Sequence, residues 1–397
     1  MTKKLFLALS LILAFSMMLS ACKPAQPVDP QIEYVEVTKI IEGETITVIE
    51  TVEVQPPVTI TVWSHFANEP LFREVISGVF EGYMAENPNV IIEVAWFDKQ
   101  PLRDSIRTVM QAGGEGAPDV TTFDHEDVDW AEAGWLASFA SVLDFKNFVV
   151  GSDVAGSYAS MDGVYKFNMA AQTDYILYNK EIFAELGIEV PENKQFTADE
   201  FISVIETCKA GGYDGFANAI GNRPYPGQYI AKGALLSVVG GEEFNKLWMG
   251  QTSWDTPEVR QALEFVVEAT DAGAWPASFS TMTLDEAHLY FHTQKKACMF
   301  YNGSWYTSRA FKPETEGGQS PDFHFGMLKY PVLEGGKAPN AVMAGFPTGY
   351  TVLANSPNKE IALDIFKYWS EHPEYGAKWA GVTNMASAIK YTAEDVP

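Results

Sequence analysis

The sequence is poor in basic residues, with 27 Lys and Arg against 52 Asp and Glu, so its formal charge is -25. Nucleic-acid binding requires clustered Lys and Arg side chains that contact phosphates. This charge balance therefore argues against a nucleic-acid partner. We interpret the acidic surface as a source of solubility.

The sequence also lacks the short motifs of common enzyme classes. It contains no G-x-S-x-G, no phosphate-binding P-loop and no H-E-x-x-H. The glycine-rich run at 113–116 follows a predicted helix, whereas a dinucleotide-binding fingerprint follows a strand and opens a helix. We interpret this run as a turn and expect no enzymatic activity and no cofactor.

Cysteine is scarce, and Cys22 lies at an informative place. It follows the apolar run from Leu5 to Ala21, which is short for a membrane span and typical of a secretory signal. The end of this run, Leu-Ser-Ala-Cys, resembles a bacterial lipobox. We expect residues 1–21 to be a signal peptide and Cys22 to carry a lipid anchor on the extracytoplasmic face of the membrane. A plain signal peptide is the alternative.

The other two cysteines are Cys208, on a predicted helix, and Cys298, on a predicted strand. An exported protein can form a disulfide, but buried free thiols are an equal alternative. The sequence leaves this question open.

Residues 22–57 are predicted to form a lipid-anchored tether. The segment begins with several prolines and continues with alternating Thr, Val and Glu, which provide no large apolar face. The alternation from Val35 to Val54 leaves a hairpin around residues 42–44 as the alternative.

The folded body is predicted to begin at Val58 with alternating strands and helices. Apolar runs at 59–66, 90–97 and 119–123 predict strands, and helical periodicity predicts helices at 71–86 and 101–113. This order favours parallel strands with helices on both faces of a sheet.

Local signals also predict helices further along the chain. Thr197 and Glu200 form a capping-box pattern, and Phe196 and Phe201 are spaced to pack across that helix start. The pairs Thr-Pro at 256–257 and Ser-Pro at 356–357 predict helix starts, with ends near 273 and 372.

Four segments carry a resemblance to a known family. The run at 163–183 joins apolar residues to the polar cluster 172–174 and closes on Tyr-Asn-Lys; the others are FYNGSW at 300–305, FGMLKYPV at 325–332 and the predicted helix at 354–369. Together they resemble the extracellular solute-binding proteins of ABC importers, in the sugar-binding branch called family 1. The resemblance extends from 59 to about 390.

The resemblance implies an α/β, two-lobed periplasmic-binding-protein-like (type II) fold with three interlobe crossings. We expect these crossings near 167–172, 328–331 and 372–376. Lobe I would comprise 58–170 and 331–373, and lobe II 171–330 and 374–397. Family members usually continue for several more helical turns, so we expect either an unusually short tail or a truncated C-terminus.

Polar residues at three predicted strand ends point to one crevice, because ligands bind outside the carboxyl ends of strands in open α/β sheets. These ends are at 64–66, 124–126 and 172–174. A sugar site requires polar side chains for hydroxyls and aromatic rings for the flat C–H faces. With positions matched by resemblance, the predicted ligand-binding residues are His65, Asp124, His125, Glu126, Gln172, Asp174, Arg223, Tyr225, Asn302, Trp305, Gly345, Phe346 and Met385.

Several of these residues have a simpler interpretation. The acidic cluster at 124–129 is also compatible with a solvated turn before a helix. Three tryptophans, Trp63, Trp254 and Trp369, are expected to pack in the interior. His65, Asp124, His125 and Glu126 offer metal-binding atoms, but not the short spacings of strong metal motifs, so we expect no metal.

The resemblance implies a monomeric, exported lipoprotein that captures a mono- or oligosaccharide and delivers it to the transmembrane subunits of an ABC permease. The alternatives are a binder of another polar solute, such as a polyol, a sugar phosphate or a metal, and a secreted glycan-processing enzyme.

Overall fold

The structure is a computed structural model, and it describes residues 31–41, 44–54, 56–124, 127–149, 163–223, 225–248, 250–346 and 348–395. The chain divides into two compact units. One comprises residues 1–58 and 88–91, and the other comprises 59–87 and 92–397. Cys22 and the predicted signal peptide lie outside the described residues. No helix in the described ranges is long and apolar enough to cross a bilayer.

The first unit contains a β-hairpin where we expected an extended tether. Strand β1 (Gln31–Ile41) pairs antiparallel with β2 (Glu44–Val54), with Gln31 opposite Val54 and Ile41 opposite Glu44. The alternating β-branched residues that suggested a spacer therefore pair with each other. The hairpin alternative is the one present.

The second unit contains two mixed sheets. The first has the strand order β4-β3-β5-β12-β6, and the second has the order β10-β7-β9-β8, with β11 also paired to β7. The strands are β3 (Val58–Ser64), β4 (Val90–Trp96), β5 (Val120–Asp124), β6 (Phe167–Asn168), β7 (Gln172–Asn179), β8 (Asp214–Phe216), β9 (Ala297–Gly303), β10 (Phe325–Leu328), β11 (Ala344–Gly345) and β12 (Thr348–Val352). We call the first sheet with its helices lobe I and the second lobe II. This mixed α/β fold with two sheets agrees with the predicted fold class.

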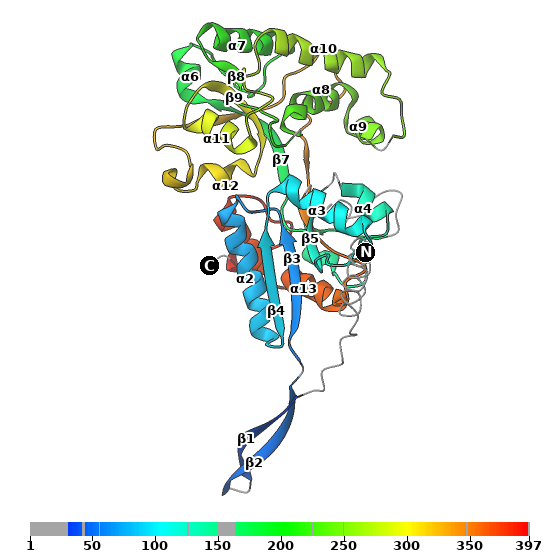
Figure 1. The fold of residues 1–397 in the computed structure, drawn as a ribbon. Helices are drawn as coiled ribbons and strands as arrows, with labels where there is room; N and C mark the ends of the chain where they lie inside the picture. Colours follow the sequence, from blue (N-terminus) through cyan, green and yellow to red (C-terminus); the bar gives the residue numbers. More distant parts are fainter. Residues whose placement is uncertain are drawn as a thin grey trace, which may run out of the picture. The chain divides into compact units, whose positions relative to one another are not determined.

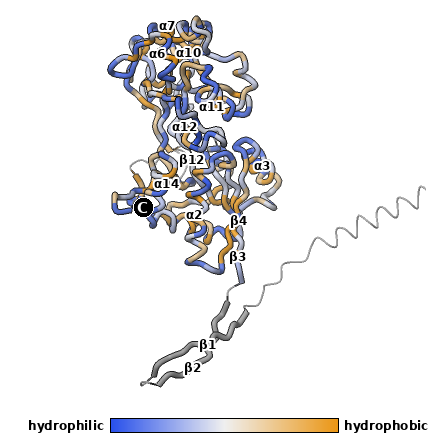
Figure 2. Tube along the Cα trace, turned by 90° about the vertical axis from the view of Figure 1, so that its left-hand side faces the viewer, coloured by the Kyte–Doolittle hydropathy of each residue, from blue (hydrophilic) through white to orange (hydrophobic). Residues whose placement is uncertain are grey.

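The helices of lobe I are α2 (Pro70–Glu86), α3 (Lys99–Gln111), α4 (Val128–Glu132), α13 (Lys359–Glu371) and α14 (Pro373–Thr383). Helix α2 carries a proline in its first turn and ends at Glu86, the residue at which the predicted helix also ends. It buries the face carrying Phe72, Val75, Ile76 and Val79, each burial stabilising the fold by roughly 1.5–3 kcal/mol. Figure 1 shows α2 alongside β4, and Figure 2 shows hydrophobic colour along β3 and β4.

The helices of lobe II are α6 (Lys180–Glu185), α7 (Ala198–Ala210), α8 (Tyr229–Val239), α9 (Gly241–Trp248), α10 (Pro257–Asp271), α11 (Leu284–His292) and α12 (Tyr306–Ala310). The capping box of α7 is present, because Thr197 and Glu200 bond to each other's backbone amides. The rings of Phe196 and Phe201 lie 6.4 Å apart, as the predicted hydrophobic contact requires. Short 3₁₀ turns lie at Phe145–Asn147, Tyr225–Gln228, Glu314–Glu316 and Ala393–Asp395.

The chain passes from the first sheet to the second between β6 and β7, inside the predicted 167–172 segment. It returns between Gly345 and Thr348, later than the predicted 328–331 segment. The reason is that β10 and β11 both pair with β7, which keeps the intervening chain in lobe II. Residues 331–343 therefore do not lie in lobe I as we expected.

Helix α14 also differs from its expected place in lobe II. Its Trp379 ring lies 4.7 Å from the ring of Phe72 on α2, between centroids. Both rings are buried, so this apolar contact holds α14 against lobe I. The remaining lobe boundaries and the number of crossings stay predictions.

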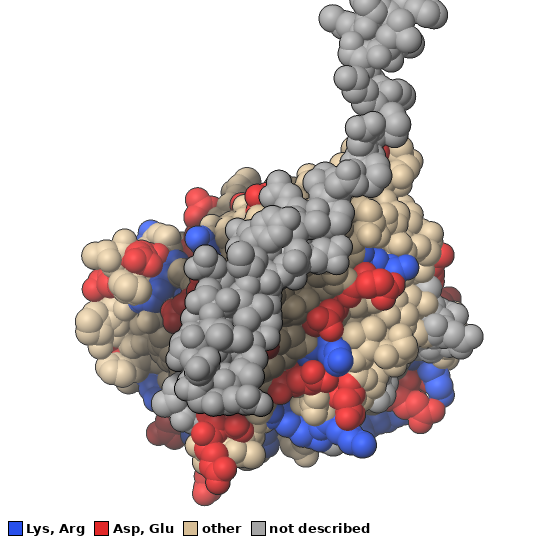
Figure 3. Space-filling view, turned by 90° about the horizontal axis from the view of Figure 1, so that it is seen from below, with Lys and Arg blue, Asp and Glu red and all other residues tan. Residues whose placement is uncertain are grey.

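Acidic and basic side chains are interspersed on the described surface in Figure 3. Basic side chains gather along the lower edge of this view, with acidic side chains beside them. This distribution fits the strongly negative formal charge of the whole sequence.

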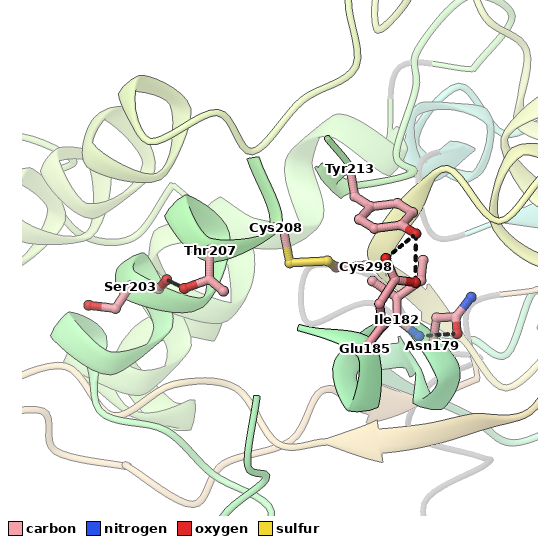
Figure 4. The surroundings of a disulfide bond; sticks show 8 residues. All are labelled: Asn179, Ile182, Glu185, Ser203, Thr207, Cys208, Tyr213 and Cys298. Atoms are coloured by element: carbon pink, nitrogen blue, oxygen red, sulfur yellow. Dashed lines mark hydrogen bonds between the residues drawn. A yellow bond between two sulfur atoms is a disulfide. The ribbon is translucent and has the colours of Figure 1, made fainter. Parts of the chain in front are cut away.

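A disulfide joins Cys208 on α7 to Cys298 on β9, across a sequence separation of 90 residues (Figure 4). Both residues are fully buried in the core of lobe II. Since disulfides persist in oxidising compartments, the bond is consistent with export. The structure thus decides a point that the sequence left open.

Removing this disulfide should lower the free energy of unfolding by about 2 to 4 kcal/mol, because the bond restricts the unfolded chain. Equilibrium denaturation of the Cys208→Ala/Cys298→Ala double variant against the wild type measures the loss. Reductant should destabilise the wild type and leave the double variant unchanged. Equal midpoints of the two proteins without reductant would contradict the assignment.

Candidate functional site

A cavity of about 690 Å³ lies between side chains of both lobes. On the lobe I side it includes Asp124, the last residue of β5, and two residues that follow β3, at the carboxyl ends where ligands bind in such sheets. On the lobe II side it includes the start of β7 and residues of α8, α9 and α12. The lining residues are His65, Phe66, Glu69, Phe72, Lys99, Arg103, Asp124, Gln172, Asp174, Arg223, Gln228, Tyr229, Lys232, Phe244, Asn245, Trp248, Trp305, Arg309, Met343 and Thr348.

Asp124 is a buried carboxylate at the carboxyl end of β5. The pairing of β5 with β12 sets Thr348 opposite Asp124, and the Thr348 hydroxyl donates a hydrogen bond to the Asp124 carboxylate. The Lys99 ammonium lies 3.2 Å from the other carboxylate oxygen. These partners fix the carboxylate at the cavity wall and balance its charge.

His65 follows β3 and is neutral at physiological pH. Burial lowers the pKa of His65 to about 4, although Asp124 acts in the opposite direction. Its Nδ1 atom is hydrogen-bonded to the Thr122 hydroxyl at 2.8 Å. The imidazole therefore contributes a polar but uncharged surface to the cavity.

The acidic turn after β5 is not simply solvated. Asp127 is buried and accepts a 2.6 Å hydrogen bond from Nε of Arg103, a cavity residue. Burial and the nearby Asp124 raise the pKa of Asp127 to about 6, against the opposing effect of Arg103. Asp129, in the first turn of α4, is exposed and pairs with Arg107.

Trp305 lies at the turn that follows β9. The preceding Gly303 is required there, because a Cβ atom at that position would lie 1.7 Å from the Trp305 ring. The ring lies 6.0 Å from that of Tyr229 on α8, between centroids. The Trp305 Nε1–H is buried and has no hydrogen-bond partner within the described residues.

The register between β7 and β9 brings the polar residues at the start of β7 next to the turn that carries Trp305. Asp174 pairs with Gly303, so the carboxylate and the Trp305 turn come together. Burial raises the pKa of Asp174 to about 7, while the Lys232 ammonium acts to lower it. Gln172, also on β7, lines the same cavity and pairs through its backbone with Gly345.

A buried ion pair links the two lobes beside the cavity. Arg309 on α12 binds the carboxylate of Glu69, the residue before α2, and also lies 2.6 Å from Asp285. Burial opposes ionisation of Glu69, but Arg309 and Arg223 outweigh it and hold the pKa of that carboxyl below its usual range. The second oxygen of Glu69, Oε2, is buried without a hydrogen-bond partner in the described ranges.

Some predicted site residues lie elsewhere. Asn302 is fully buried, and its amide donates to Nε2 of His288 at 3.1 Å, away from the cavity lining. Met385 is also buried. Gly345 and Phe346 belong to the return passage and do not line the cavity. His125 and Glu126 lie outside the described residues, as does the side chain of Tyr225.

Several of the lining residues were not among the predicted site residues. Glu69, Lys99 and Arg103 lie on or beside predicted helices, where charged residues normally face solvent. Arg309 lies on α12, a short helix that was not predicted. Lys232 and Trp248 lie on α8 and α9 and gave no motif. Only the position of Glu69 could have indicated a role in the site. Glu69 stands directly before α2, which starts with a proline, and a few residues after the end of β3.

The three tryptophans predicted to pack differ in their environments. Trp369 is fully buried, and Trp63 is half-buried against Phe97 at 5.4 Å between ring centroids. Trp254 is 45% exposed, which contradicts its predicted interior place. No group of three or more His, Cys, Asp or Glu in the described ranges is arranged to hold a metal ion.

Comparison with known proteins identifies the family. The profile of the bacterial extracellular solute-binding proteins matches residues 69–374, so the chain belongs to this family. A relative from Streptococcus mutans, described as a multiple sugar-binding protein, is 24% identical over 340 residues, covering 83% of this chain and 76% of the relative. A mannitol-binding protein from Pseudomonas aeruginosa is 22% identical over 53% of this chain and 47% of its own length.

Solved structures support the same fold. A protein from a study of xylan utilisation by Caldanaerobius polysaccharolyticus aligns with a TM-score of 0.72 and 24% identity, covering 85% of both chains. A chitin oligosaccharide binding protein aligns with a TM-score of 0.71 and 17% identity, covering 84% of this chain and 82% of the other. At these identities the likeness establishes the two-lobed fold alone.

Asp174→Asn should stabilise the protein by an amount that grows from pH 4 to pH 7 and then stays constant. The pKa of Asp174 is about 7 in the folded state against 3.8 normally, so its ionisation penalises the folded state as the pH rises through this range. The gain at pH 8 should be on the order of 2 to 4 kcal/mol.

Denaturant unfolding at pH 4, 6 and 8 measures this trend. Asp255→Asn, at an exposed carboxylate outside the cavity, controls for the general loss of a negative charge. A constant difference between Asp174→Asn and the wild type at all three pH values would show that Asp174 ionises freely.

Proposed function

We propose that this protein captures a carbohydrate between its two lobes and delivers it to the permease of an ABC importer. The observation that carries this proposal is the chemistry of the cavity wall. It combines an aromatic ring, a buried donor at Trp305 Nε1 and a buried acceptor at Glu69 Oε2, neither of which has a partner within the described residues. A sugar hydroxyl both donates and accepts, so adjacent hydroxyls on one ring satisfy both kinds of atom.

The predicted residues that the cavity contains are proposed to bind this sugar: His65, Asp124, Gln172, Asp174, Arg223 and Trp305. His125, Glu126 and Tyr225 remain proposed contacts on the strength of the sequence resemblance. The relative named for multiple sugar binding supports a carbohydrate as the solute. The relative named for mannitol binding corresponds to the polyol alternative.

The charge distribution favours a neutral sugar over a sugar phosphate. Most basic side chains in the cavity lie beside carboxylates: Lys99 beside Asp124, Arg103 beside Asp127, and Arg309 beside Glu69 and Asp285. Arg223 lies 3.6 Å from Asp98. A phosphate would have to compete with these acids, whereas hydroxyls add to the existing pairs without displacing them.

We further propose that the protein acts as an exported, monomeric lipoprotein and returns its sugar unchanged. A thermal-shift screen of mono- and oligosaccharides identifies the ligand, since a solute that binds only the folded state raises the melting temperature. Chromatography of the bound sugar after long incubation distinguishes capture from glycan processing, which would convert the sugar into products.

Trp305→Ala should weaken sugar binding about thirtyfold, or roughly 2 kcal/mol, because it removes the stacking face. Binding calorimetry measures the loss. Gly303→Ala should weaken binding as well, since its Cβ would displace the Trp305 ring. Trp275→Ala is the matched control, because Trp275 packs against Phe216 and Phe279 and does not line the cavity.

The melting temperatures of the unliganded variants complete this test. Normal binding by Trp305→Ala, or equal weakening by Trp275→Ala, would place the sugar elsewhere.

Cys22→Ser should leave export intact and release the protein from the membrane, since the lipid would have no thiol to join. Membrane and soluble fractions of cells expressing the wild type and the variant measure the distribution. Retention of the variant in the membrane fraction would rule out Cys22 as the anchor.

A further inference from the structure

Aromatic side chains continue from the interior of the cavity to the protein surface. Trp305 and Tyr229 lie within it, and Phe244 and Trp248 of α9 line it further along. Trp248 is 50% exposed although it is a cavity residue, and the neighbouring Trp254 is 45% exposed. Large exposed apolar side chains that adjoin each other mark binding sites more often than isolated ones do.

The ring of Trp248 is held in place by its neighbours. Trp254 contacts it edge-on at 5.3 Å between centroids, and Phe244, one helical turn earlier, lies 5.9 Å away. Trp254 is itself fixed, because its Nε1–H donates a 3.1 Å hydrogen bond to the carbonyl of Leu247. A ring fixed in this way loses little conformational entropy when a ligand stacks on it.

Polar groups accompany this ring along the cavity wall. The Lys232 ammonium lies 5.2 Å from the Trp248 ring centroid, and Lys232 also lines the cavity. Asn245 is three residues before Trp248 on the same helical face. An aromatic face beside an amide and an ammonium group matches the alternating apolar and hydroxyl surfaces of a sugar ring.

The size of the cavity indicates more than one sugar unit. A single hexose fills on the order of 200 Å³ at the packing density of protein interiors. The cavity measures about 690 Å³, so one unit against Trp305 leaves room for others toward Trp248.

We propose that Trp248, supported by Trp254, forms an outer subsite that stacks a further unit of an oligosaccharide whose first unit lies against Trp305. The proposal rests on the proposed carbohydrate function and specifies its substrate class as an oligosaccharide of at least two units. The continuity of Trp248 with the cavity favours a sugar over a protein partner at this face.

The test uses xylo-, chito- and malto-oligosaccharide ladders of one to five units, with calorimetry on the wild type and Trp248→Ala. Wild-type affinity should rise with length. Trp248→Ala should bind the longer members about tenfold more weakly, from loss of apolar contact area, and bind the shortest member within twofold of the wild type. Trp254→Ala should show a smaller loss of the same length dependence, and Trp248→Phe should recover part of it.

Phe311→Ala is the matched control, since Phe311 is an exposed aromatic side chain of lobe II outside the cavity. It should bind every ladder member like the wild type. Equal effects of Trp248→Ala at all lengths, or none at any length, would overturn the outer subsite while leaving sugar capture intact. An unchanged Trp248→Ala variant would assign the exposed tryptophans to another role, such as a protein contact. Failure of the wild type to bind any ladder member would overturn the carbohydrate function and the subsite together.

Discussion

The buried contact between Arg309 and Glu69 determines how the two walls of the cavity meet. Glu69 stands before the first helix of lobe I, and Arg309 lies on α12 of lobe II. Separating them would leave two charges that must be rehydrated, and breaking a buried pair on one side alone typically costs 3–5 kcal/mol. The other positions in the cavity are therefore set relative to this contact. A solute stabilises the closed arrangement of the lobes only through contacts that it makes there and not in the open arrangement.

This contact also explains why a cavity with so many charges can suit a neutral solute. The Arg309 guanidinium is shared between Glu69 and Asp285, and Asp124 is held between Lys99 and Thr348. Such pairs contribute fixed donors and acceptors rather than a net field. A solute lacking one of the matching hydroxyls would leave a buried polar atom unpaired, which costs about 1–3 kcal/mol. The protein would therefore discriminate among sugars mainly through the cost of leaving its own buried polar atoms unpaired by a poorly matched sugar.

Local signals in the sequence predicted the elements, while pairings between distant residues determined where those elements lie. The capping box at Thr197 and the helix end at Glu86 depend on neighbouring residues, and both were predicted correctly. The later return passage depends on a two-residue strand, Ala344–Gly345, that pairs with β7. No local pattern reveals so short a pairing.

The residues of the candidate site also fall into those that the sequence could place and those that it could not. Asp124 could be placed because it lies at the carboxyl end of β5, where ligands bind in such sheets. Asp174 also lines the cavity, but it lies near the start of β7 in the second sheet and not at the carboxyl strand end that we expected. Arg309 could not be placed, since a helical arginine usually faces solvent and only its contact with Glu69 reveals its position. Asn302 shows the reverse error. It belongs to the FYNGSW segment that carries the resemblance, and we expected its amide in the ligand site. Burial lowers the pKa of His288, and the neutral imidazole accepts a hydrogen bond from the Asn302 amide inside lobe II.

The proposed binding of the first sugar unit and the proposed binding of a further unit depend on separate parts of the fold. One strand register sets Asp174 opposite Gly303, and the missing Cβ of Gly303 admits the Trp305 ring. A slip of one residue would turn the side chains of β7 to the other face of the sheet, so the carboxylate and the ring are positioned together or not at all. Trp248 depends instead on α9 and on Trp254, outside that sheet. If the sugar binds as proposed, changes at α9 would therefore alter the preferred length of the ligand without disturbing the inner site, whereas changes at β7 or β9 would affect every ligand.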